Sequence, residues 1–182
     1  NNRVRKITSA GVISTIAGTG TAGYLGDGCA PTAARLNQPN NVALGSSGDF
    51  YITDYYGSRI RKFKNNHAPL FTGGHHQAAT ICSGDTLAVN TQLAAIDSDA
   101  GSDITWSVAL PPAHGVVAAV YSATSTGTVI TPTGRYYIPT LGYSGTDSFR
   151  IRTTDCAGTT DSTTIVVTVS PPPSLIRSEE HT

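Results

Sequence analysis

Apolar residues recur at every second position along much of this chain, and this spacing constrains the fold more than any other feature. Near the C-terminal end the apolar residues are Phe149, Ile151, Ile165, Val167 and Val169. Successive side chains of a β-strand point to opposite faces of a sheet, whereas a helical face repeats every 3.6 residues. The sequence therefore predicts an all-β fold.

The composition favours short strands joined by tight turns. The 182 residues include 19 glycines and 10 prolines, and charged residues make up 13%, about half the usual share. The formal net charge is zero, so the chain lacks the positive field that attracts nucleic acid or an anionic membrane. Aliphatic runs such as residues 165–167 are far too short to span a membrane. We expect neither nucleic acid binding nor membrane insertion.

A short motif occurs twice in the first third of the chain. RVRKI at residues 3–7 recurs as RIRKF at residues 59–63, and both copies alternate basic and apolar residues as a half-buried strand does. The strands expected between the copies are 12–17, 42–44 and 50–53, with a hairpin turn at 46–49. Residues 18–38 form a longer excursion that is rich in Gly and Ala.

Residues 1–64 resemble the NHL repeat, a family of β-propeller blades. The matching runs are QPNNVAL (38–44), GDFYITD (48–54) and SRIRKF (58–63), although Gly45 and Ser58 stand where Asp and Asn are usual. The resemblance implies one full blade and the tail of a preceding one, and hence an incomplete propeller. Because neighbouring blades cover both faces of such a small sheet, the expected partners are further blades of the same protein.

The composition changes after Lys64 and predicts a second domain. Residues 65–72 are expected to form a linker, residues 73–170 an antiparallel β-sandwich, and residues 171–182 a Pro-rich exit followed by a tail. The expected strands of the sandwich are 79–82, 86–95, 104–110, 116–122, 134–138, 148–153 and 163–169. Trp106 and Val108 share one face, and we expect them near the centre of the core.

Residues 67–170 resemble the bacterial cadherin-like and Ig-like repeats of large surface proteins. The runs that carry the resemblance are NHAPLF (66–71), DSDAG (97–101), YIP (137–139) and GYSGTDSF (142–149). The resemblance implies an Ig-like sandwich, further modules in the same chain, and an extracellular or bacterial cell-surface location. The predicted fold class is thus all-β, a partial propeller plus an Ig-like or cadherin-like sandwich.

Carboxylates in the run DSDAG form the candidate metal site. Hard oxygen ligands that converge on a tight turn suit calcium, but the spacing is not that of an EF-hand. In cadherin-like domains an Asp-x-Asp pair at this place binds calcium between modules, so the resemblance implies a ligand role for Asp97 and Asp99. Asn66 and Asp155 are further candidates. Asp and Gly also favour turns in their own right, and calcium is the one candidate cofactor.

Three cysteines allow one disulfide. Cys82 ends the first expected strand of the sandwich and Cys156 follows the penultimate one. Edge strands of a sandwich can be neighbours, so a Cys82–Cys156 disulfide is geometrically reasonable. The alternative is two separate buried thiols. Cys29 has no evident partner in the sequence.

The motifs that suggest catalysis or cofactor binding are weak. GTGTAG at residues 18–23 matches the dinucleotide fingerprint, but no good helix-forming residues follow it, which favours a glycine-rich loop. His67, His75 and His76 lack companion ligands at zinc-site spacing and are expected to be loop histidines. No Gly-x-Ser-x-Gly elbow is present.

The glutamates near the end of the chain are not candidates for a catalytic acid either. The two glutamates, Glu179 and Glu180, fall within RSEEHT (177–182), which reads like a translated sequencing adapter; the alternative is a natural polar tail. We therefore expect that the chain is not an enzyme. Met is absent, also at position 1, which indicates a piece of a larger protein.

Together these features predict a non-catalytic fragment of a large secreted bacterial surface protein with a structural, adhesive or ligand-binding role. Tyr24 and Asp27 of the excursion are expected to contribute to contacts with a protein or carbohydrate ligand. The alternative is a pair of accessory modules of an extracellular enzyme, an NHL-type lyase or a carbohydrate-active enzyme, whose catalytic part lies elsewhere. An intracellular scaffold is disfavoured by the Ig-like partner domain.

Overall fold

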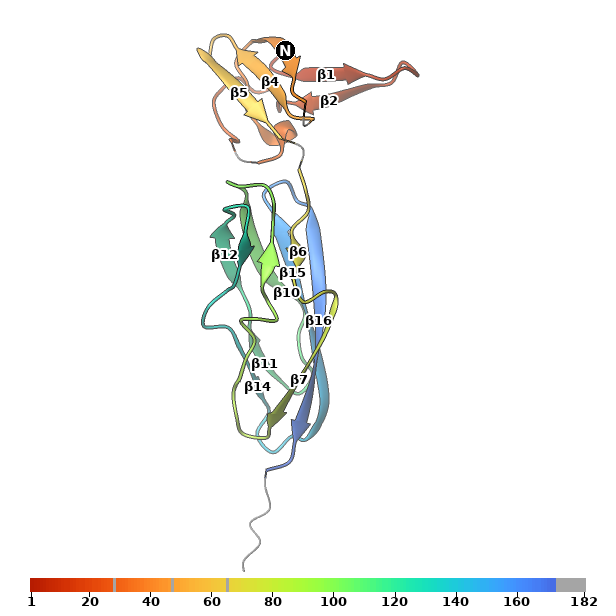
Figure 1. The fold of residues 1–182 in the computed structure, drawn as a ribbon, viewed down its shortest axis with the longest axis vertical. Helices are drawn as coiled ribbons and strands as arrows, with labels where there is room; N and C mark the ends of the chain where they lie inside the picture. The colour runs from red at the N-terminus through yellow and green to blue at the C-terminus, as the bar shows by residue number, and fades with distance from the viewer. Residues whose placement is uncertain (28, 47, 65, 173–182) are drawn as a thin grey trace, which may run out of the picture.

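Short antiparallel strands build both halves of the chain, as the period-two pattern predicts (Figure 1). The computed structural model describes residues 1–27, 29–46, 48–64 and 66–172. Within them the chain forms a small blade and an elongated sandwich, and the predicted all-β fold is confirmed. The elements of the blade are β1 (Val4–Ile7), β2 (Ile13–Ala17), the 3₁₀ turn η1 (Pro31–Ala33), β3 (Pro39–Leu44), β4 (Phe50–Asp54) and β5 (Arg59–Phe63).

The blade consists of a two-stranded hairpin, β1–β2, and a three-stranded sheet in the order β3–β4–β5. The turn between β3 and β4 closes through a bond from the Gly45 N–H to the Asp49 carbonyl at 2.7 Å, where the sequence predicts a hairpin. Phe50 and Phe63 stack 5.4 Å apart on one face of this sheet. The buried apolar residues of the blade are Ala17, Ala34, Leu36, Phe50, Ile52 and Phe63.

Arg61 holds the excursion 18–38 against the blade. Its guanidinium is 4% exposed, donates to the carbonyls of Arg35 at 2.7 Å and Leu25 at 3.0 Å, and pairs with Asp27. Residues 59–63 do alternate between the two faces of the sheet, as predicted. The face that points inward, however, carries the charged Arg61, whereas Ile60 is 72% exposed. A backbone hydrogen bond from the Gly18 N–H to the Pro31 carbonyl also holds the glycine-rich loop in place.

The sandwich has one long sheet facing two short ones. The long sheet has the order β12–β10–β15–β16–β7, and the short sheets are β11–β14–β8 and β13–β9–β6. The strands are β6 (Leu70–Phe71), β7 (His76–Cys82), β8 (Leu87–Ala88), β9 (Ala95–Ile96), β10 (Asp103–Leu110), β11 (Gly115–Ala118), β12 (Tyr121–Thr124), β13 (Val129–Ile130), β14 (Tyr136–Pro139), β15 (Gly145–Asp155) and β16 (Thr160–Ser170). All pairs in the sandwich are antiparallel except β7–β16, which is parallel.

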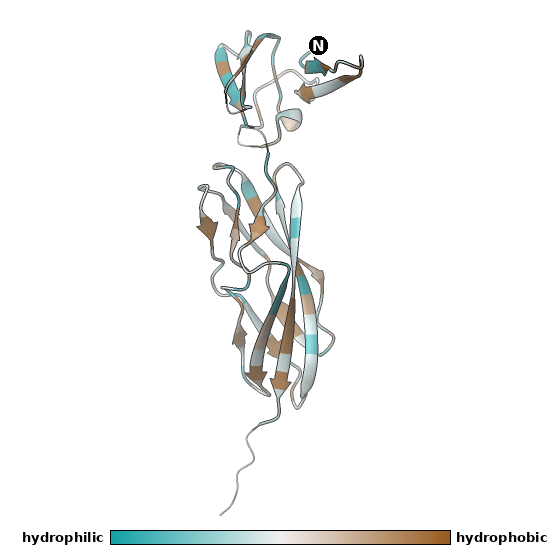
Figure 2. Ribbon diagram, turned by 45° about the vertical axis from the view of Figure 1, so that its right-hand side comes forward, coloured by the Kyte–Doolittle hydropathy of each residue, from teal (hydrophilic) through white to brown (hydrophobic). Residues whose placement is uncertain are grey.

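The core of the sandwich lies between the two layers. Figure 2 shows hydrophobic and hydrophilic positions alternating along its longest strands. Trp106 is 1% exposed, as predicted, and its Nε1–H donates to the Leu93 carbonyl at 2.9 Å, while Val108 packs against the core at its margin. The buried apolar residues are Phe71, Ile81, Val89, Leu93, Ala95, Ile104, Trp106, Ala119, Tyr137, Phe149, Ile151, Ile165, Val167 and Val169.

The structure differs from the sequence prediction at three places in the sandwich. The predicted linker ends too late, because Leu70–Phe71 pairs with β9 and Phe71 is buried. The predicted strand 86–95 is two short strands separated by a turn, in which the Leu93 N–H bonds to the Val89 carbonyl at 3.1 Å. The predicted strand 116–122 is divided between β11 and β12, which belong to different layers.

The C-terminal residues 173–182 lie outside the described residues, and with them the adapter-like run 177–182. β16 ends at Ser170, at the end of the sandwich that is farthest from the blade (Figure 1). A search of the described residues for a long apolar helix of membrane-spanning length finds none.

Candidate functional site at the junction of the two units

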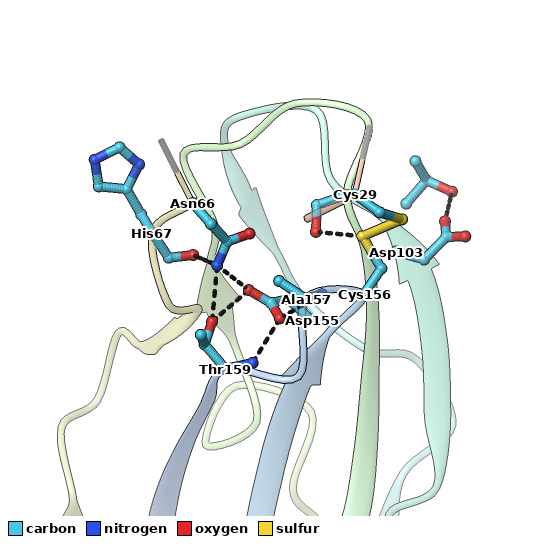
Figure 3. The surroundings of a disulfide bond; sticks show 10 residues. Cys29, Asn66, His67, Asp103, Asp155, Cys156, Ala157 and Thr159 are labelled. Carbon is cyan, nitrogen blue, oxygen red and sulfur yellow. Dashed lines mark hydrogen bonds between the residues drawn. A yellow bond between two sulfur atoms is a disulfide. The ribbon is translucent and has the colours of Figure 1, made fainter. Parts of the chain in front are cut away.

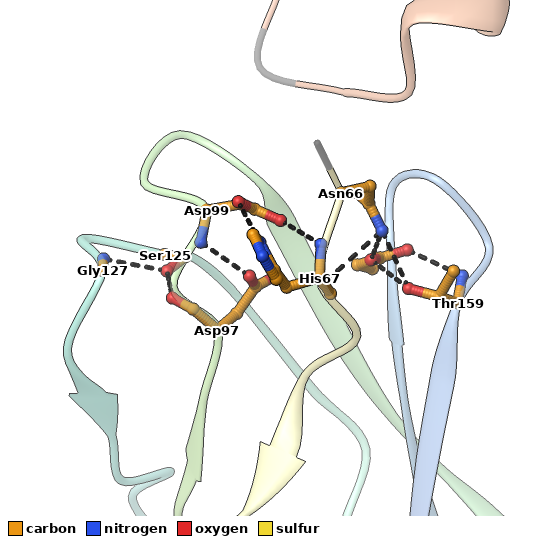
Figure 4. Close-up of polar contacts among 8 residues, drawn as sticks. Asn66, His67, Asp97, Asp99, Ser125, Gly127 and Thr159 are labelled. Carbon is orange, nitrogen blue, oxygen red and sulfur yellow. Dashed lines mark hydrogen bonds and ion pairs between the residues drawn. The ribbon is translucent and has the colours of Figure 1, made fainter. Parts of the chain in front are cut away.

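The blade and the sandwich meet at the end of the sandwich where the linker enters (Figures 3 and 4). Three segments come together there: the linker at residues 66–67, the loop between β9 and β10, and the turn between β15 and β16. Cys29 of the blade excursion reaches the same place. We call this group of segments the junction.

A disulfide between Cys29 and Cys156 joins the two units covalently. The two Cα atoms are 5.3 Å apart and the residues are 127 apart in sequence. Figure 3 shows the bond beside the turn that follows β15. The Oγ of Ser102, from the loop after β9, lies 3.5 Å from the Cys156 sulfur. The excursion of the blade is thus fixed to the sandwich.

The predicted Cys82–Cys156 disulfide is wrong. Cys156 lies just before β16, whereas Cys82 pairs with Ser170 at the other end of the same strand. The 11 residues of β16 separate the two cysteines by roughly 36 Å at about 3.3 Å per residue. Cys82 is free and exposed, so the alternative of two buried thiols fails as well.

Asp155 anchors the linker to the β15–β16 turn. Its carboxylate accepts hydrogen bonds from the Thr159 N–H at 2.8 Å, the Ala157 N–H at 2.9 Å and the Asn66 Nδ2 at 2.8 Å (Figure 3). Burial raises the pKa of Asp155, but the hydrogen bonds from Thr159, Asn66 and Ala157 outweigh it and leave the pKa below its ordinary value. The ionised carboxylate therefore holds the turn and the linker together.

Asp99 anchors the next linker residue. It accepts the His67 N–H at 2.6 Å, and its other oxygen lies 3.1 Å from the His67 Nδ1 (Figure 4). The Asp99 N–H in turn donates to Asp97 at 2.8 Å, and the Ser125 hydroxyl donates to the Asp97 carbonyl at 2.6 Å. A continuous chain of hydrogen bonds thus runs from the linker into the loop after β9.

Asp97 carries the unmet acceptor of the junction. Its side chain is fully buried, and its Oδ2 has no hydrogen-bond partner among the described residues. Burial raises the pKa of Asp97, and the carboxylates of Asp99 and Asp155 raise it further, against opposing hydrogen bonds from the Asp99 backbone and the Ser102 side chain. An unsatisfied buried acceptor is costly.

The junction brings together all the residues predicted as calcium ligands: Asn66, Asp97, Asp99 and Asp155. Among the carboxylate oxygens of these residues, the Asp97 Oδ2 alone lacks a hydrogen-bond partner in the described part of the chain, whereas N–H groups donate to Asp99 and Asp155. Within the described part of the chain, no group of three or more His, Cys, Asp or Glu side chains is arranged to hold a metal ion. Calcium binding stays a prediction.

A small hollow lies between the two units. Its volume is about 190 Å³, and Lys62, Lys64, Asn66 and Asp99 line it together with Cys29. Sites for drug-sized ligands occupy roughly 300–1,000 Å³, so this hollow is small for a substrate. Among its polar residues, Asn66 and Asp99 hold the linker to the sandwich.

The two excursion residues expected to contact a ligand are engaged within the blade. The Tyr24 hydroxyl donates to Asp27 at 2.6 Å, and the Arg59 guanidinium lies 3.7 Å from the centre of the Tyr24 ring. Asp27 also pairs with Arg61. Tyr24 remains 52% exposed, so its ring still presents a surface, whereas Asp27 serves to fix the excursion.

Two structural carboxylates were missed by sequence reasoning. Asp147 accepts the N–H groups of Ala113 and His114, each at 3.0 Å, and the Tyr137 hydroxyl at 2.8 Å. Asp161 accepts the Phe71 N–H at 2.8 Å and so holds β6 to the long sheet. The run GYSGTDSF contains Asp147 and was its one available signal, whereas nothing in the sequence distinguishes Asp161 or pairs Cys29.

Comparison with known proteins finds relatives and solved structures that are similar to parts of this chain. Teneurin-3 of Danio rerio is 30% identical over an alignment of 93 residues, and the match covers 45% of this chain and 3% of Teneurin-3. An endo-fucoidan hydrolase from glycoside hydrolase family 107 aligns with 72% of this chain and 20% of its own, at 15% identity and a TM-score of 0.40. A variant of that enzyme covers 98% of this chain and 24% of its own, at 13% identity and a TM-score of 0.41. The chain thus spans a small part of each of these proteins.

Both resemblances proposed from the sequence are confirmed by family matches, in the same order along the chain. Residues 36–63 match the NHL repeat, which covers β3, β4 and β5. Residues 66–168 match the bacterial Ig domain and reach from the linker anchor Asn66 almost to the end of β16. Since this second match spans more than half of the sequence, the chain belongs to the bacterial Ig domain family.

Proposed function

We propose that this chain is a non-catalytic part of a large secreted bacterial surface protein, in which a propeller blade and an Ig-like sandwich form one fixed unit for display, adhesion or ligand binding. The observation that carries the proposal is the Cys29–Cys156 disulfide between the two units. Structural disulfides persist in oxidising surroundings such as the cell exterior and are rare in the cytosol.

The junction supports a role in which the relative orientation of the two units matters. Domains joined by a short linker move relative to each other unless their interface is large and apolar. Here the disulfide joins the two units directly, and the Asn66–Asp155 and His67–Asp99 bonds fasten the linker to the sandwich, which shortens the free linker. A fixed orientation is useful when one unit positions the other at a distance from its attachment point.

The open surfaces of the blade support further blades of the same protein as partners. The face of the sheet that carries Tyr51 and Ile60 lies uncovered, with a shallow hollow lined by Val42, Tyr51 and Ile60. The edge of β5 is also open among the described residues. β1, which carries the first copy of the repeated motif, pairs with β2. β5, which carries the second copy, lies at the outer edge of its sheet (Figure 1). Neighbouring strands usually cover such edges.

The use of the polar side chains supports a non-catalytic role. A catalytic acid, base or nucleophile must present a free atom to a substrate. At the junction Asp99 and Asp155 are engaged by N–H donors of the linker and the turn, and the unmet oxygen of Asp97 is buried. These carboxylates fix loops, and the proposal assigns them no reaction.

Surface digestion of intact cells that carry the full-length protein tests the proposal. Trypsin places the three cysteines on different peptides: residues 7–35, residues 65–135 and a peptide that begins at Thr153. We expect the first and third to be released from intact cells as a disulfide-linked pair, with Cys82 open to alkylation. Recovery only after lysis, with all three thiols free, would contradict an extracellular role. A substrate turned over by these residues alone would contradict the non-catalytic role.

A further inference from the structure

The first and last long strands of the sandwich lie side by side and run in the same direction. β7 pairs with β16 in parallel at seven positions, from His76–Thr164 to Cys82–Ser170. The linker enters at the junction and the chain leaves beyond Ser170 at the opposite end (Figure 1). Tension along the molecule therefore acts on the two ends of the sandwich along its long axis.

Without the disulfide, this tension must pass through the fold. It enters at Asn66, reaches β7, and crosses to β16 through the hydrogen bonds between the two strands. Because the strands are parallel and pulled from opposite ends, all of their paired positions are loaded together in shear. Once they separate, residues 66–170 extend to roughly 350 Å at about 3.4 Å per residue, whereas the folded β16 spans about 36 Å.

The disulfide provides a second, shorter covalent path. From Cys29 the load crosses to Cys156, the first residue of the β15–β16 turn, and then follows β16 to the exit. Residues 30–155 lie off this path, so their folded structure bears no part of the tension. This section of chain contains nearly all of the sandwich.

The path through the sandwich is already almost fully extended. β16 is a continuous strand of 11 residues, and a strand rises about 3.3 Å per residue against a maximum of roughly 3.6 Å. Tension along β16 therefore yields little additional length, and no hydrogen bond to β15 or β7 has to break before the backbone is taut.

We propose a further function for this chain: it transmits tension along a covalent path from Cys29 through Cys156 and β16 that bypasses the Ig fold. Reduction of the disulfide moves the load onto the β7–β16 pairing and makes the sandwich extensible. The biological setting rests on the proposed surface location, but the load path follows from the disulfide and the strand order alone.

Single-molecule force spectroscopy on the whole chain, held at its N-terminus and beyond Ser170, tests this. Cys82→Ser serves as the reference protein, since it removes the free thiol and leaves the path intact. For the oxidised reference we expect a total gain in length below roughly 100 Å, set by the blade residues before Cys29. After reduction, and equally in Cys82→Ser combined with Cys29→Ser, residues 30–155 are released and a further gain of roughly 430 Å should appear, most of it from the sandwich.

Two results would overturn the load path. One is a sandwich-sized gain in the oxidised reference, after intact mass has shown its two cysteines to be bonded. The other is the absence of that gain after reduction, which would mean that the linker does not load the fold. An intact mass that shows two free thiols in the unreduced reference also refutes the proposal. Surface digestion of cells reports separately on location, so the two proposals can fail independently.

Discussion

The blade and the sandwich are built from the same alternating pattern, but only the sandwich covers its own core. In the sandwich a long sheet faces two short ones, and 14 buried apolar residues lie between the layers. The blade buries six, and the other face of its sheet, with Ile60, stays open. A period-two pattern thus specifies strands, but it does not say whether the covering layer comes from the same domain or from a neighbour.

The two units also differ in how they hold their loops. In the sandwich, buried carboxylates accept backbone N–H groups: Asp147 holds the segment before β11, and Asp155 the β15–β16 turn. The blade has one such carboxylate, Asp54, which accepts the Asn37 N–H. It adds a buried cation, since Arg61 donates to the carbonyls of Leu25 and Arg35. Charge-assisted bonds of this kind are roughly twice as strong as neutral ones. Each unit therefore depends on a few ionised side chains for its loop geometry.

The largest expected effect separates the two units as fragments. Residues 66–170 should fold alone with a stability on the order of 5–15 kcal/mol, as domains of this size do, because their core is complete. Residues 1–64 should show no cooperative unfolding, because a small sheet with one covered face is marginal in water. Circular dichroism on heating each fragment measures this difference. A cooperative melt of the N-terminal fragment would remove the distinction between the units.

Truncation of one aromatic residue in each core sharpens the comparison. Trp106→Ala should destabilise the sandwich by about 3–5 kcal/mol, because it opens a large cavity at a fully buried site. Phe50→Ala, made in the same full chain, should leave the unfolding of the sandwich unchanged within about 0.5 kcal/mol. Denaturant unfolding of Phe50→Ala can be followed by Trp106 fluorescence, and that of both variants by circular dichroism. Equal effects of the two changes would show that the cores are not independent.

The class of the fold could be predicted because it depends on local pattern. The alternation along β15 and β16 and the repeated motif at β5 require no knowledge of distant contacts. The missed features depend on tertiary context. Val89 and Leu93 are buried in the core although they lie in a turn, and the period-two pattern of the sequence does not predict this turn. The burial of Arg61 in place of Ile60 depends on the excursion that packs over one face only.

The junction could be predicted in part. Asn66, Asp97, Asp99 and Asp155 were selected as one group, and the structure brings them to one end of the sandwich. The disulfide was assigned to the wrong pair, because strand direction decides which cysteine lies near Cys156. A sequence gives no indication that β16 separates Cys82 from Cys156, nor that the excursion carries Cys29 to the junction.

A third test concerns Asp147 and the sandwich alone. Burial raises the pKa of Asp147, but bonds from the Tyr137 hydroxyl and from the backbone of His114, Ala113 and Ser148 lower it below the ordinary 3.8. Asp147→Asn should cost about 2–3 kcal/mol at neutral pH, since charge-assisted hydrogen bonds are lost. Thermal or urea unfolding of the 66–170 fragment gives the free energy of unfolding for each protein.

The pH dependence of this difference follows from the direction of the pKa shift. A carboxylate with a lowered pKa contributes stability that is present above its unfolded pKa and is lost as the pH falls through its folded pKa. The gap between wild type and Asp147→Asn should therefore be constant above about pH 5 and shrink below 3.8. Asp103→Asn is the matched control, because Asp103 is exposed and its loss should change stability by at most about 0.5 kcal/mol. A gap that widens in acid would refute this role of Asp147.

The smallest expected effect concerns calcium at the junction, where the two units share polar groups. Among the carboxylate oxygens there, the buried oxygen of Asp97 has no hydrogen-bond partner in the described part of the chain, so a cation could bind it without displacing an N–H donor. Millimolar calcium, the range of extracellular modules, should raise the melting temperature of the full chain. At ten times the dissociation constant the gain is about 1.4 kcal/mol. Asp97→Asn should abolish the rise, while Asp103→Asn should preserve it. An unchanged melting temperature would mean that calcium does not stabilise the junction, which hydrogen bonds and the disulfide alone then hold together.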